Sequence, residues 1–340
     1  MRPTSPVGNL GNAPDTEVMN DGTSDYGAVA YNYHIATTEV TNAQYADFLN
    51  AKAAANDPFT LYNSNMDSQP LGGITRTGVS GSFTYTTKTE MGNKPVNAVS
   101  WYDAIRFVNW LHNGQGSGDT ETGAYTLLGG TATPSNRSSI TRNAGAIWFL
   151  PSEDEWYKAA YYDPALASGS GDYWDYATQS NSAPTIATAN SVGDISNPGA
   201  NVANYDLGAD WNSQNGNVTT VGSAGPLSDS FYGTADQGGN VWEWNEALIS
   251  GSLRGMRGGA WNTAANTLGL LASNRNDNLP TSEGLHIGFR VATVPEPSSF
   301  ALAALGILGV MAYARRRARS SGGFSANQAK QRLATPNRLR

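Results

Sequence analysis

The sequence predicts an α+β fold in which regular secondary structure is sparse. Its 340 residues include 38 Gly and only 14% charged residues, a composition typical of loop-rich globular proteins rather than helical bundles or disordered chains. Three segments carry strong helix-start signals, whereas long irregular connections fill 53–92, 114–144 and 163–235. Loops of that length in a compact domain are usually functional or held by a bound ion.

The first predicted helix covers residues 41–49 (TNAQYADFL). Thr41 can cap its N-terminus, and Gln44 three residues later completes a capping box. Val40 and Tyr45 lie where a hydrophobic staple would form. These residues predict a helix that docks one face on a core.

The second predicted helix covers residues 100–111 (SWYDAIRFVNWL). Ser100 and Asp103 stand at capping-box spacing. An apolar stripe at helical spacing follows, formed by Trp101, Ala104, Ile105, Val108 and Leu111.

The third predicted helix lies within residues 150–164 (LPSEDEWYKAAYYDP). Ser152 and Glu155 make its capping box, and three acidic residues fill a first turn that favours negative charge. Short apolar runs at 145–150 and 287–291 predict strands. The remainder is rich in Gly, Asn, Ser and Thr, and predicts irregular structure.

The composition excludes several classes of chemistry. No cysteine occurs, which excludes disulfides, thiolate nucleophiles and thiolate metal sites. The net charge is -7, but eight of the 21 Lys and Arg lie in 315–340, where no acid occurs. The preceding 314 residues therefore hold 13 basic against 28 acidic residues, a net charge of -15. Such a body repels phosphates, so we expect no nucleic-acid partner.

Residues 294–320 (VPEPSSFALAALGILGVMAYARRRARS) combine an uncharged apolar run with a basic cluster. As a helix, the run at 300–314 would span ~22 Å, a little short for a bilayer core, although adjacent serines and snorkelling arginines extend it. A buried core helix is the alternative, but it seldom ends in three arginines, so the pattern favours a single transmembrane helix. The arginines then place the C-terminus in the cytoplasm and the acidic domain outside.

This stretch resembles a PEP-CTERM sorting signal. The matching residues are Pro295, Glu296 and Pro297, the apolar helix, and the cluster that begins Arg315, Arg316 and Arg317. The resemblance implies an exported bacterial protein, held in the inner membrane until an exosortase processes it and attaches it to the cell surface or extracellular matrix. The basic tail at 321–340 is longer than this pattern usually has. Residues 1–28 form an N-terminal lead-in without an apolar signal-peptide region, so we expect either that the true start lies upstream or that this fragment has lost its leader.

Residues 238–244 (GGNVWEW) place one carboxylate between two indoles. In an extended segment side chains alternate, so Trp242 and Trp244 share one face while Glu243 points to the other. Glu243 then needs a partner, which from these residues alone is a cation, an arginine or a set of backbone amides.

Six blocks in order resemble the formylglycine-generating-enzyme family, also called the sulfatase-modifying-factor domain. They are EVTNAQYADFLNA (39–51), KPVNAVSWYDAIRFVNWL (94–111), FLPSEDEWYKAA (149–160), GGNVWEW (238–244), RGGAWN (257–262) and GFRVA (288–292). The resemblance covers residues 29–293. It implies a duplicated C-type-lectin-like fold with long loops, stabilised by calcium.

Carried over position by position, the resemblance implies metal ligands. One calcium site would be formed by Asp236, Gly239, Val241 and Glu243, and a second would begin at Asn204 and Tyr205, with Asp210 as a candidate acidic ligand. The alternative for Glu243 is an ion pair with an arginine such as Arg257 or Arg290. The matching blocks favour calcium.

The sequence departs from the family enzyme at its copper ligands. Two cysteines bind copper in the enzyme, and their positions fall here at about Thr263 and Leu268, neither of which is a soft ligand. Copper-dependent formylglycine generation is therefore excluded. The three histidines (His34, His112 and His286) are far apart and predict structural roles, and we expect no catalytic residue. The iron-type enzymes of this family use an additional helical domain that we do not recognise in this sequence.

Two hypotheses follow from these observations. The first is an exported, surface-anchored, non-catalytic binding module whose loops at 163–235 and 262–286 hold a ligand such as matrix polysaccharide. The second is an enzyme with an unrecognised, non-cysteine chemistry in the cleft that corresponds to the family active site. Trp174 and Trp211 lie in the long loops and are candidates for stacking on a ligand. The tryptophans of the framework blocks are expected in the core (Trp101, Trp156, Trp242 and Trp261).

Overall fold

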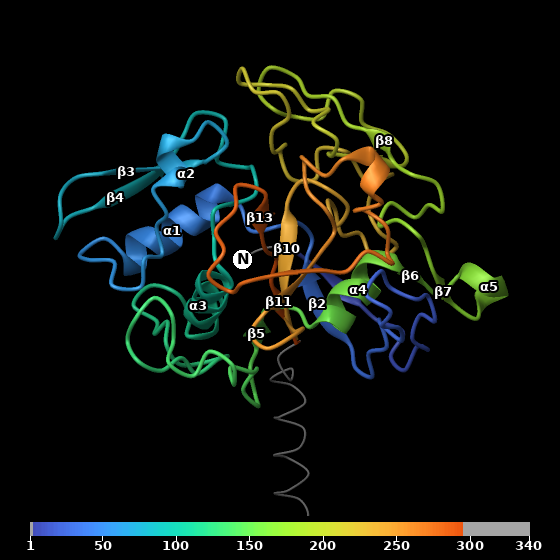
Figure 1. Cartoon of the computed structure of the whole chain (residues 1–340), viewed down its shortest axis with the longest axis horizontal. Coiled ribbons are helices and arrows are strands. Elements are labelled where there is room, and N and C mark those ends of the chain that lie inside the picture. The colour runs from blue at the N-terminus through green and yellow to red at the C-terminus, as the bar shows by residue number, and fades with distance from the viewer. Residues whose placement is uncertain (1–2, 295–340) are drawn as a thin grey trace, which may run out of the picture. The chain divides into compact units, whose positions relative to one another are not determined.

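Two four-stranded sheets organise the fold in the computed structural model, which describes residues 3–294 (Figure 1). The first sheet has the antiparallel order β1 (Thr4–Val7), β2 (Tyr33–Ala36), β14 (Ala292–Thr293), β5 (Trp148–Phe149). The second has the order β12 (Asn276–Asn278), β11 (Arg254–Arg257), β10 (Trp242–Leu248), β13 (Ile287–Gly288). Only the β10–β13 pair of this sheet is parallel.

Three helices begin where the sequence predicts them. They are α1 (Asn42–Lys52), α3 (Trp101–His112) and α4 (Glu153–Tyr161), and each has a complete capping box. In each box a Thr or Ser side chain accepts from the backbone amide three residues later. The predicted apolar stripe of α3 is buried throughout, because the helix packs into the main core and against β5.

The remaining elements are short. They are α2 (Asn65–Ser68), α5 (Leu166–Gly169), a 3₁₀ turn (Ala265–Thr267), the hairpin of β3 (Ile74–Thr77) and β4 (Thr84–Thr87), the pair β6 (Tyr162–Asp163) and β7 (Asp172–Tyr173), and the parallel pair β8 (Thr185–Ile186) and β9 (Val202–Ala203). In Figure 1, α1, α2 and the β3–β4 hairpin lie on one side of β10, and β6 to β8 with α5 lie on the other. The mixed, loop-rich architecture agrees with the prediction.

The N-terminal residues belong to this fold. Strand β1 pairs with β2 over its whole length, from Thr4 opposite Ala36 to Val7 opposite Tyr33. Met19 is 2% exposed and packs in the cluster that contains Trp156 and Tyr157. The folded unit therefore reaches N-terminal of the boundary at residue 29 that the sequence led us to expect.

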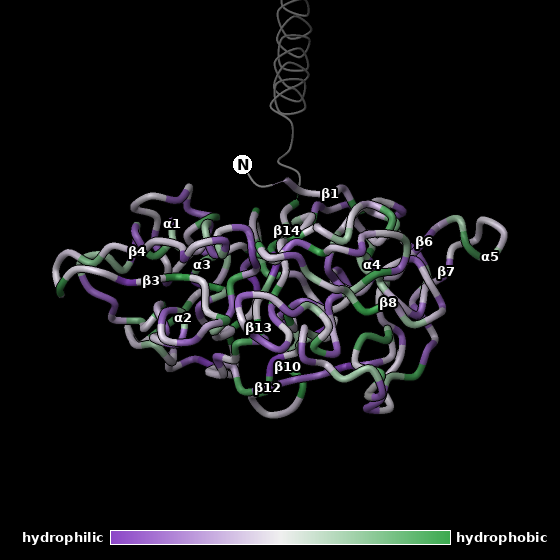
Figure 2. The backbone as a smooth tube through the Cα atoms, turned by 90° about the horizontal axis from the view of Figure 1, so that it is seen from above, coloured by the Kyte–Doolittle hydropathy of each residue, from purple (hydrophilic) through white to green (hydrophobic). Residues whose placement is uncertain are grey.

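The sorting signal and basic tail lie outside the described residues, as does the predicted apolar helix at 300–314. Within residues 3–294, no helix is long and apolar enough to cross a membrane. In Figure 2, hydrophobic and hydrophilic residues alternate in short stretches along the described chain.

Candidate functional site

Glu243 lies in β10 and is fully buried. Its Oε2 atom accepts from Arg290 Nε at 2.6 Å and from Trp156 Nε1 at 2.7 Å, and its Oε1 atom accepts from Arg290 Nη2 at 2.7 Å. Arg257 pairs with Glu153 instead, at 2.8 Å. Of the partners that the sequence left open for Glu243, the structure shows Arg290. The two-pronged pair matches the geometry in which guanidinium and carboxylate bind most strongly.

The tryptophans on either side of Glu243 are structural. Trp242 and Trp244 are 9% and 0% exposed and belong to the main core. The indole of Trp244 donates to the carbonyl of Val99 at 3.1 Å. The alternation of β10 therefore separates an apolar core face from a face that carries the buried ion pair.

Asp236 and Glu39 face the same arginine as Glu243. Burial raises the pKa of Asp236 to about 6, although the amide of Gly222 donates to its carboxylate at 2.5 Å. Burial and the nearby Asp236 raise the pKa of Glu39 well above its usual range, and Glu39 Oε2 is buried without a hydrogen-bond partner. Arg290 thus has three carboxylates around it, and Glu243 already uses both oxygens. Asp236 and Glu39 therefore lack the full counter-charge that Arg290 gives to Glu243.

Asn204 lies in a second group of oxygen atoms. Its side-chain amide nitrogen donates to Asn217 O at 2.9 Å, Asn240 Oδ1 at 3.2 Å and Thr219 Oγ1 at 3.3 Å. Its Oδ1 atom is buried without a partner. Asn240 in turn donates to Glu39 Oε1 at 3.0 Å, which connects this group to the carboxylates around Arg290.

The other residues expected at calcium sites have different surroundings. Tyr205 donates its hydroxyl to Pro184 O at 2.6 Å, and Asp210 accepts from a turn amide at 2.7 Å. Val241 packs in a small apolar cluster. Gly239 has φ +94°, and a Cβ there would lie 2.3 Å from the carbonyl oxygen of Asn204. This glycine is therefore required for the close approach of two backbone segments.

The positions of the family's copper ligands hold no metal-binding side chain. Thr263 Oγ1 accepts from Ala260 N at 2.8 Å, and Leu268 is 59% exposed. Leu268 borders a cavity of about 20 Å³ whose lining is apolar except for Tyr176 and Tyr205. The residues that line this cavity include no histidine and no acidic residue, and the nearby Asp206 carboxylate accepts from Ala265 N at 3.0 Å.

The histidines do not converge. His34 contacts Thr4 Oγ1 at 3.3 Å, and His112 Nδ1 accepts from Ile147 N at 3.1 Å. Burial lowers the pKa of His286. In the part of the chain that the structure describes, no three His, Cys, Asp or Glu side chains are grouped so that they could hold a metal ion.

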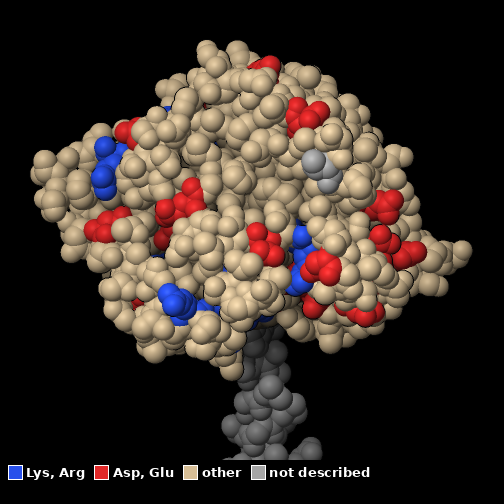
Figure 3. All heavy atoms as spheres, viewed as in Figure 1, with Lys and Arg blue, Asp and Glu red and all other residues tan. Residues whose placement is uncertain are grey.

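A cleft of about 320 Å³, here called the acidic cleft, forms where three segments meet. Its lining residues are Asp15, Glu17, Asp172, Tyr173, Trp174, Asp175, Leu271, Ala272 and Ser273. Four of them are carboxylates and two are aromatic. Acidic side chains also predominate among the charged residues on the face in Figure 3. An acidic cleft with aromatic walls suits a ligand that has hydrogen-bond donors and flat apolar surfaces.

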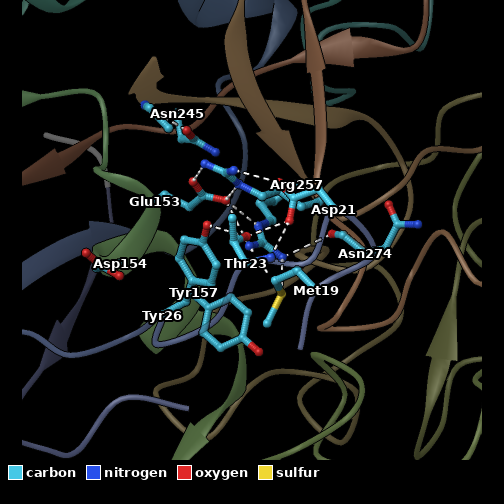
Figure 4. Close-up of polar contacts among 12 residues, drawn as sticks. Met19, Asp21, Thr23, Tyr26, Glu153, Asp154, Tyr157, Asn245, Arg257 and Asn274 are labelled. Atoms are coloured by element: carbon cyan, nitrogen blue, oxygen red, sulfur yellow. Dashed lines mark hydrogen bonds and ion pairs between the residues drawn. The ribbon is translucent and has the colours of Figure 1, made fainter. Parts of the chain in front are cut away.

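One wall of the cleft is fixed by the cluster in Figure 4. Arg257 Nη1 donates to Ala272 O at 2.7 Å and to Asn274 O at 3.1 Å, and Arg257 Nε donates to Glu153 at 2.9 Å. Arg275 joins Glu153 to Asp21, both at 2.8 Å. The segment around Ser273 is therefore held by hydrogen bonds from a buried arginine rather than left as a free loop.

The side chains of the cleft are also oriented by the fold. Tyr157 donates to Asp15 Oδ2 at 2.7 Å, and the Trp174 indole donates to Asp163 Oδ2 at 3.3 Å. Trp174 is partly exposed and lines the cleft, and its stacking on a ligand stays a prediction. Trp211 is 7% exposed and donates to Val218 O at 2.9 Å, so the same expectation for Trp211 was wrong.

Sequence reasoning missed the acidic members of this cleft. Asp15 and Glu17 lie in residues 1–28, which the sequence predicts to be a lead-in outside the domain, and Asp172 and Asp175 lie in a long loop without a motif. The sequence signal for this cleft is the run of acidic and aromatic residues around Trp174. The convergence of the three segments is a tertiary property.

The short sheets, the long connections and the six blocks together define a known class of domain, in which a loop-rich α and β scaffold carries its sites on loops. The chain belongs to the sulfatase-modifying factor enzyme 1-like domain family, whose model matches residues 11–294. A PEP-CTERM protein-sorting motif matches residues 293–317, and it implies processing by an exosortase.

Two curated relatives are hercynine oxygenases. That of Mycolicibacterium thermoresistibile is 30% identical over 166 residues, which cover 42% of this chain and 31% of the relative. That of Mycolicibacterium smegmatis is 29% identical over 166 residues, covering 42% and 32%. The chain thus spans about a third of the length of these relatives.

A solved structure with a TM-score of 0.50 is similar to this chain in fold alone. Treponema denticola variable protein 1 superposes with a TM-score of 0.50 at 19% identity, covering 86% of this chain and 95% of that chain. PvdO from Pseudomonas aeruginosa gives a TM-score of 0.44 at 19% identity, covering 86% and 92%.

Proposed function

We propose that this protein is an exported, surface-anchored, non-catalytic binding module that holds a neutral or amino-bearing polysaccharide in its acidic cleft. The observation that carries the proposal is the combination of Trp174 and Tyr173 with four carboxylates in one cleft. A sugar ring presents hydroxyl donors at its edge and C–H groups on its faces. Carboxylates accept from the former, and aromatic rings pack against the latter.

The charge of the cleft narrows the ligand class. Asp172 and Asp175 are exposed, and the structure gives the side chains of Glu17 and Asp175 no hydrogen-bond partner. These carboxylates would repel a uronic acid or a sulfated sugar, whereas an amino sugar would be attracted. The domain charge of -15 acts in the same direction at longer range.

An enzyme remains the second candidate because the curated relatives are oxygenases. Against it stand the apolar cavity at Leu268 and the scattered histidines among the described residues. Metal analysis of the purified chain separates the two functions. Calcium without copper or iron supports the binding module, and a stoichiometric redox metal supports the enzyme.

Structural calcium is part of the proposal, at the carboxylates around Arg290 rather than at Glu243. Two observations support it. Asp236 and Glu39 add more negative charge than Arg290 can balance, and one side-chain oxygen of Glu39 and one of Asn204 have no hydrogen-bond partner among the described residues. Amide and carbonyl oxygens would complete the ligand set that calcium prefers. A bound calcium would hold the loops that carry these oxygens.

Location is the third part of the proposal. Before processing, the apolar run at 300–314 anchors the chain in the inner membrane with the domain outside. Exosortase processing near Pro295 then places the domain at the cell surface or in the extracellular matrix. Mass spectrometry of the protein recovered from an exosortase-containing host tests this step. A mature C-terminus near Pro295 supports it, whereas recovery of intact Arg340 at the surface contradicts it.

A glycan array probed with the full chain tests the ligand class. We expect binding to neutral or amino-bearing polysaccharides, with loss of signal for Trp174→Ala. Phe231→Ala is the matched control, since Phe231 is an exposed aromatic residue (42%) that does not line the cleft. Absence of glycan binding, or equal binding by both variants, would reject the cleft as the site.

A further inference from the structure

A second cavity, here called the arginine cavity, lies between the N-terminus of α3 and the β10–β11 pair. Its volume is about 270 Å³, and the side chains that matter below are Trp101, Ile140, Arg142, Glu246, Leu248 and Arg254. None of these residues lines the acidic cleft. The two cavities are therefore separate sites.

The two arginines of this cavity differ in their partners. Arg142 pairs with Glu155 at 2.6 Å and with Glu246 at 2.7 Å, so its charge is fully compensated. Arg254 is 3% exposed, and in residues 3–294 no carboxylate lies within 4.0 Å of its guanidinium. A buried cation without an anion is costly, and burial accordingly lowers the pKa of Arg254.

Neutral contacts hold Arg254 in place but leave donors unused. Its two terminal nitrogens donate to the carbonyls of Glu246 at 2.9 Å and Ile140 at 3.0 Å. Its guanidinium carbon lies 3.8 Å from the ring centroid of Trp101, a cation–π contact. A guanidinium has five N–H donors, so three of those of Arg254 have no hydrogen-bond acceptor among residues 3–294. The side chain is rigid, positively charged and placed against an open cavity.

We propose that the arginine cavity binds a small carboxylic acid with an apolar body, whose carboxylate pairs with Arg254. The guanidinium fork matches a carboxylate in shape and charge. Ile140, Leu248 and Trp101 supply apolar walls for the remainder of the ligand. Glu246 shares the charge of Arg142 with Glu155 and accepts from the hydroxyl of Tyr125, and these two donors weaken its repulsion of the anion. The volume suits a molecule about the size of one aromatic ring, below the usual range for drug-sized ligands.

Benzoate is the probe, and neutral benzamide, which has the same shape, is its control. Isothermal titration of the full-length chain in detergent should show saturable benzoate binding at millimolar concentrations and binding of benzamide weaker by about tenfold or more. Arg254→Gln should weaken benzoate binding by a similar factor, and Arg254→Lys should retain part of it. Arg76→Gln is the matched control, since Arg76 is an exposed arginine remote from this cavity.

A second variant tests the cavity even if Arg254→Gln fails to fold. Leu248 is 44% exposed, so Leu248→Trp should fill the cavity without removing a buried charge, and should abolish benzoate binding. Glucuronate tests the apolar requirement, because it carries the same charge on a polar body and should bind more weakly. Equal binding of benzamide and benzoate, tighter binding of glucuronate, or unchanged benzoate binding in the folded Arg254→Gln protein would overturn the proposal. Failure of the glycan array would leave this result unaffected, because the two sites share no residue.

Discussion

The acidic cleft and the arginine cavity both depend on the β10–β11 pair, yet they carry opposite charge in opposite surroundings. In the cleft, Asp172 and Asp175 are exposed and water can solvate them. In the cavity, Arg254 is 3% exposed, and its partners within residues 3–294 are carbonyls and an indole. An exposed unpaired charge costs little, whereas a buried one costs much.

This difference shows that exposed charges and buried charges have different effects on ligand binding and on stability. The carboxylates of the cleft select among ligands by sign, and they need no ligand for the fold to be stable. The buried charge of Arg254 is itself relieved by an anion, so ligand binding at the arginine cavity should also raise the free energy of unfolding. Exposed charge in a cleft thus determines which ligands bind, whereas buried charge in a cavity also affects the free energy of unfolding.

The largest expected effect comes from breaking the framework that both sites share. Arg290→Met removes one partner of the buried pair with Glu243 and leaves the carbonyls of Ala36 and Ala235 without their donor. We expect a loss of about 3–5 kcal/mol in the free energy of unfolding, measured by urea denaturation, and weaker binding at both sites. The double variant Glu243→Gln/Arg290→Met should lose less than the single variant, because it leaves no unpaired charge. A loss below about 1 kcal/mol in the single variant would contradict the buried ion pair.

The second effect is a pH dependence of the carboxylates beside that pair. The pKa of Asp236 is about 6 in the fold, against 3.8 for the ordinary carboxyl, so between these values the folded state binds more protons than the unfolded state. The free energy of unfolding should therefore fall as pH rises from about 4 to about 6, by roughly 2–3 kcal/mol from this group. Asp236→Asn should remove this part of the slope.

Added calcium should change the pH dependence of the free energy of unfolding. A cation bound at Asp236 and Glu39 would stabilise their ionised forms, so added calcium should restore stability at pH 7 and do little at pH 4. Urea denaturation with calcium and with chelator, on the wild type and on Asp236→Asn, measures it. A calcium response that is equal at both pH values, or unchanged in the variant, would place any calcium elsewhere.

The sequence predicted the framework well and the sites poorly, for a physical reason. Capping boxes such as Ser100 with Asp103 are local, so three helix starts could be predicted from the chain alone. The choice of Arg290 over Arg257 for Glu243 depends on how β13 and the segment after it pack beside β10, which no local pattern encodes. The acidic cleft joins residues near 15 to residues near 172 and 272, so only the fold could bring them together.

The third prediction tests whether the acidic cleft and the arginine cavity bind their ligands independently. Trp174→Ala should weaken glycan binding by about fivefold, the equivalent of an aromatic contact of roughly 1 kcal/mol, and leave benzoate binding unchanged. Arg254→Gln should show the reverse pattern. Titration of each variant with each ligand measures both. If either variant weakened both ligands while its melting temperature stayed at the wild-type value, the two cavities would be coupled rather than independent.

The smallest expected effect concerns the exposed acids that give the cleft its sign. Glu17→Gln and Asp175→Asn remove solvated charges, so the free energy of unfolding should change by less than about 0.5 kcal/mol. An exposed charge pair contributes about 0.2–1 kcal/mol, so each variant should weaken binding of an amino-bearing glycan by at most about fivefold and have less effect on a neutral one. Raising the salt concentration should reduce the difference between variants, since the charges are screened. Asp47→Asn, which neutralises an exposed acid on α1 outside the cleft, is the matched control. An equal loss for neutral and amino-bearing glycans would show that these carboxylates act as hydrogen-bond acceptors for hydroxyl groups and not as a source of charge selectivity.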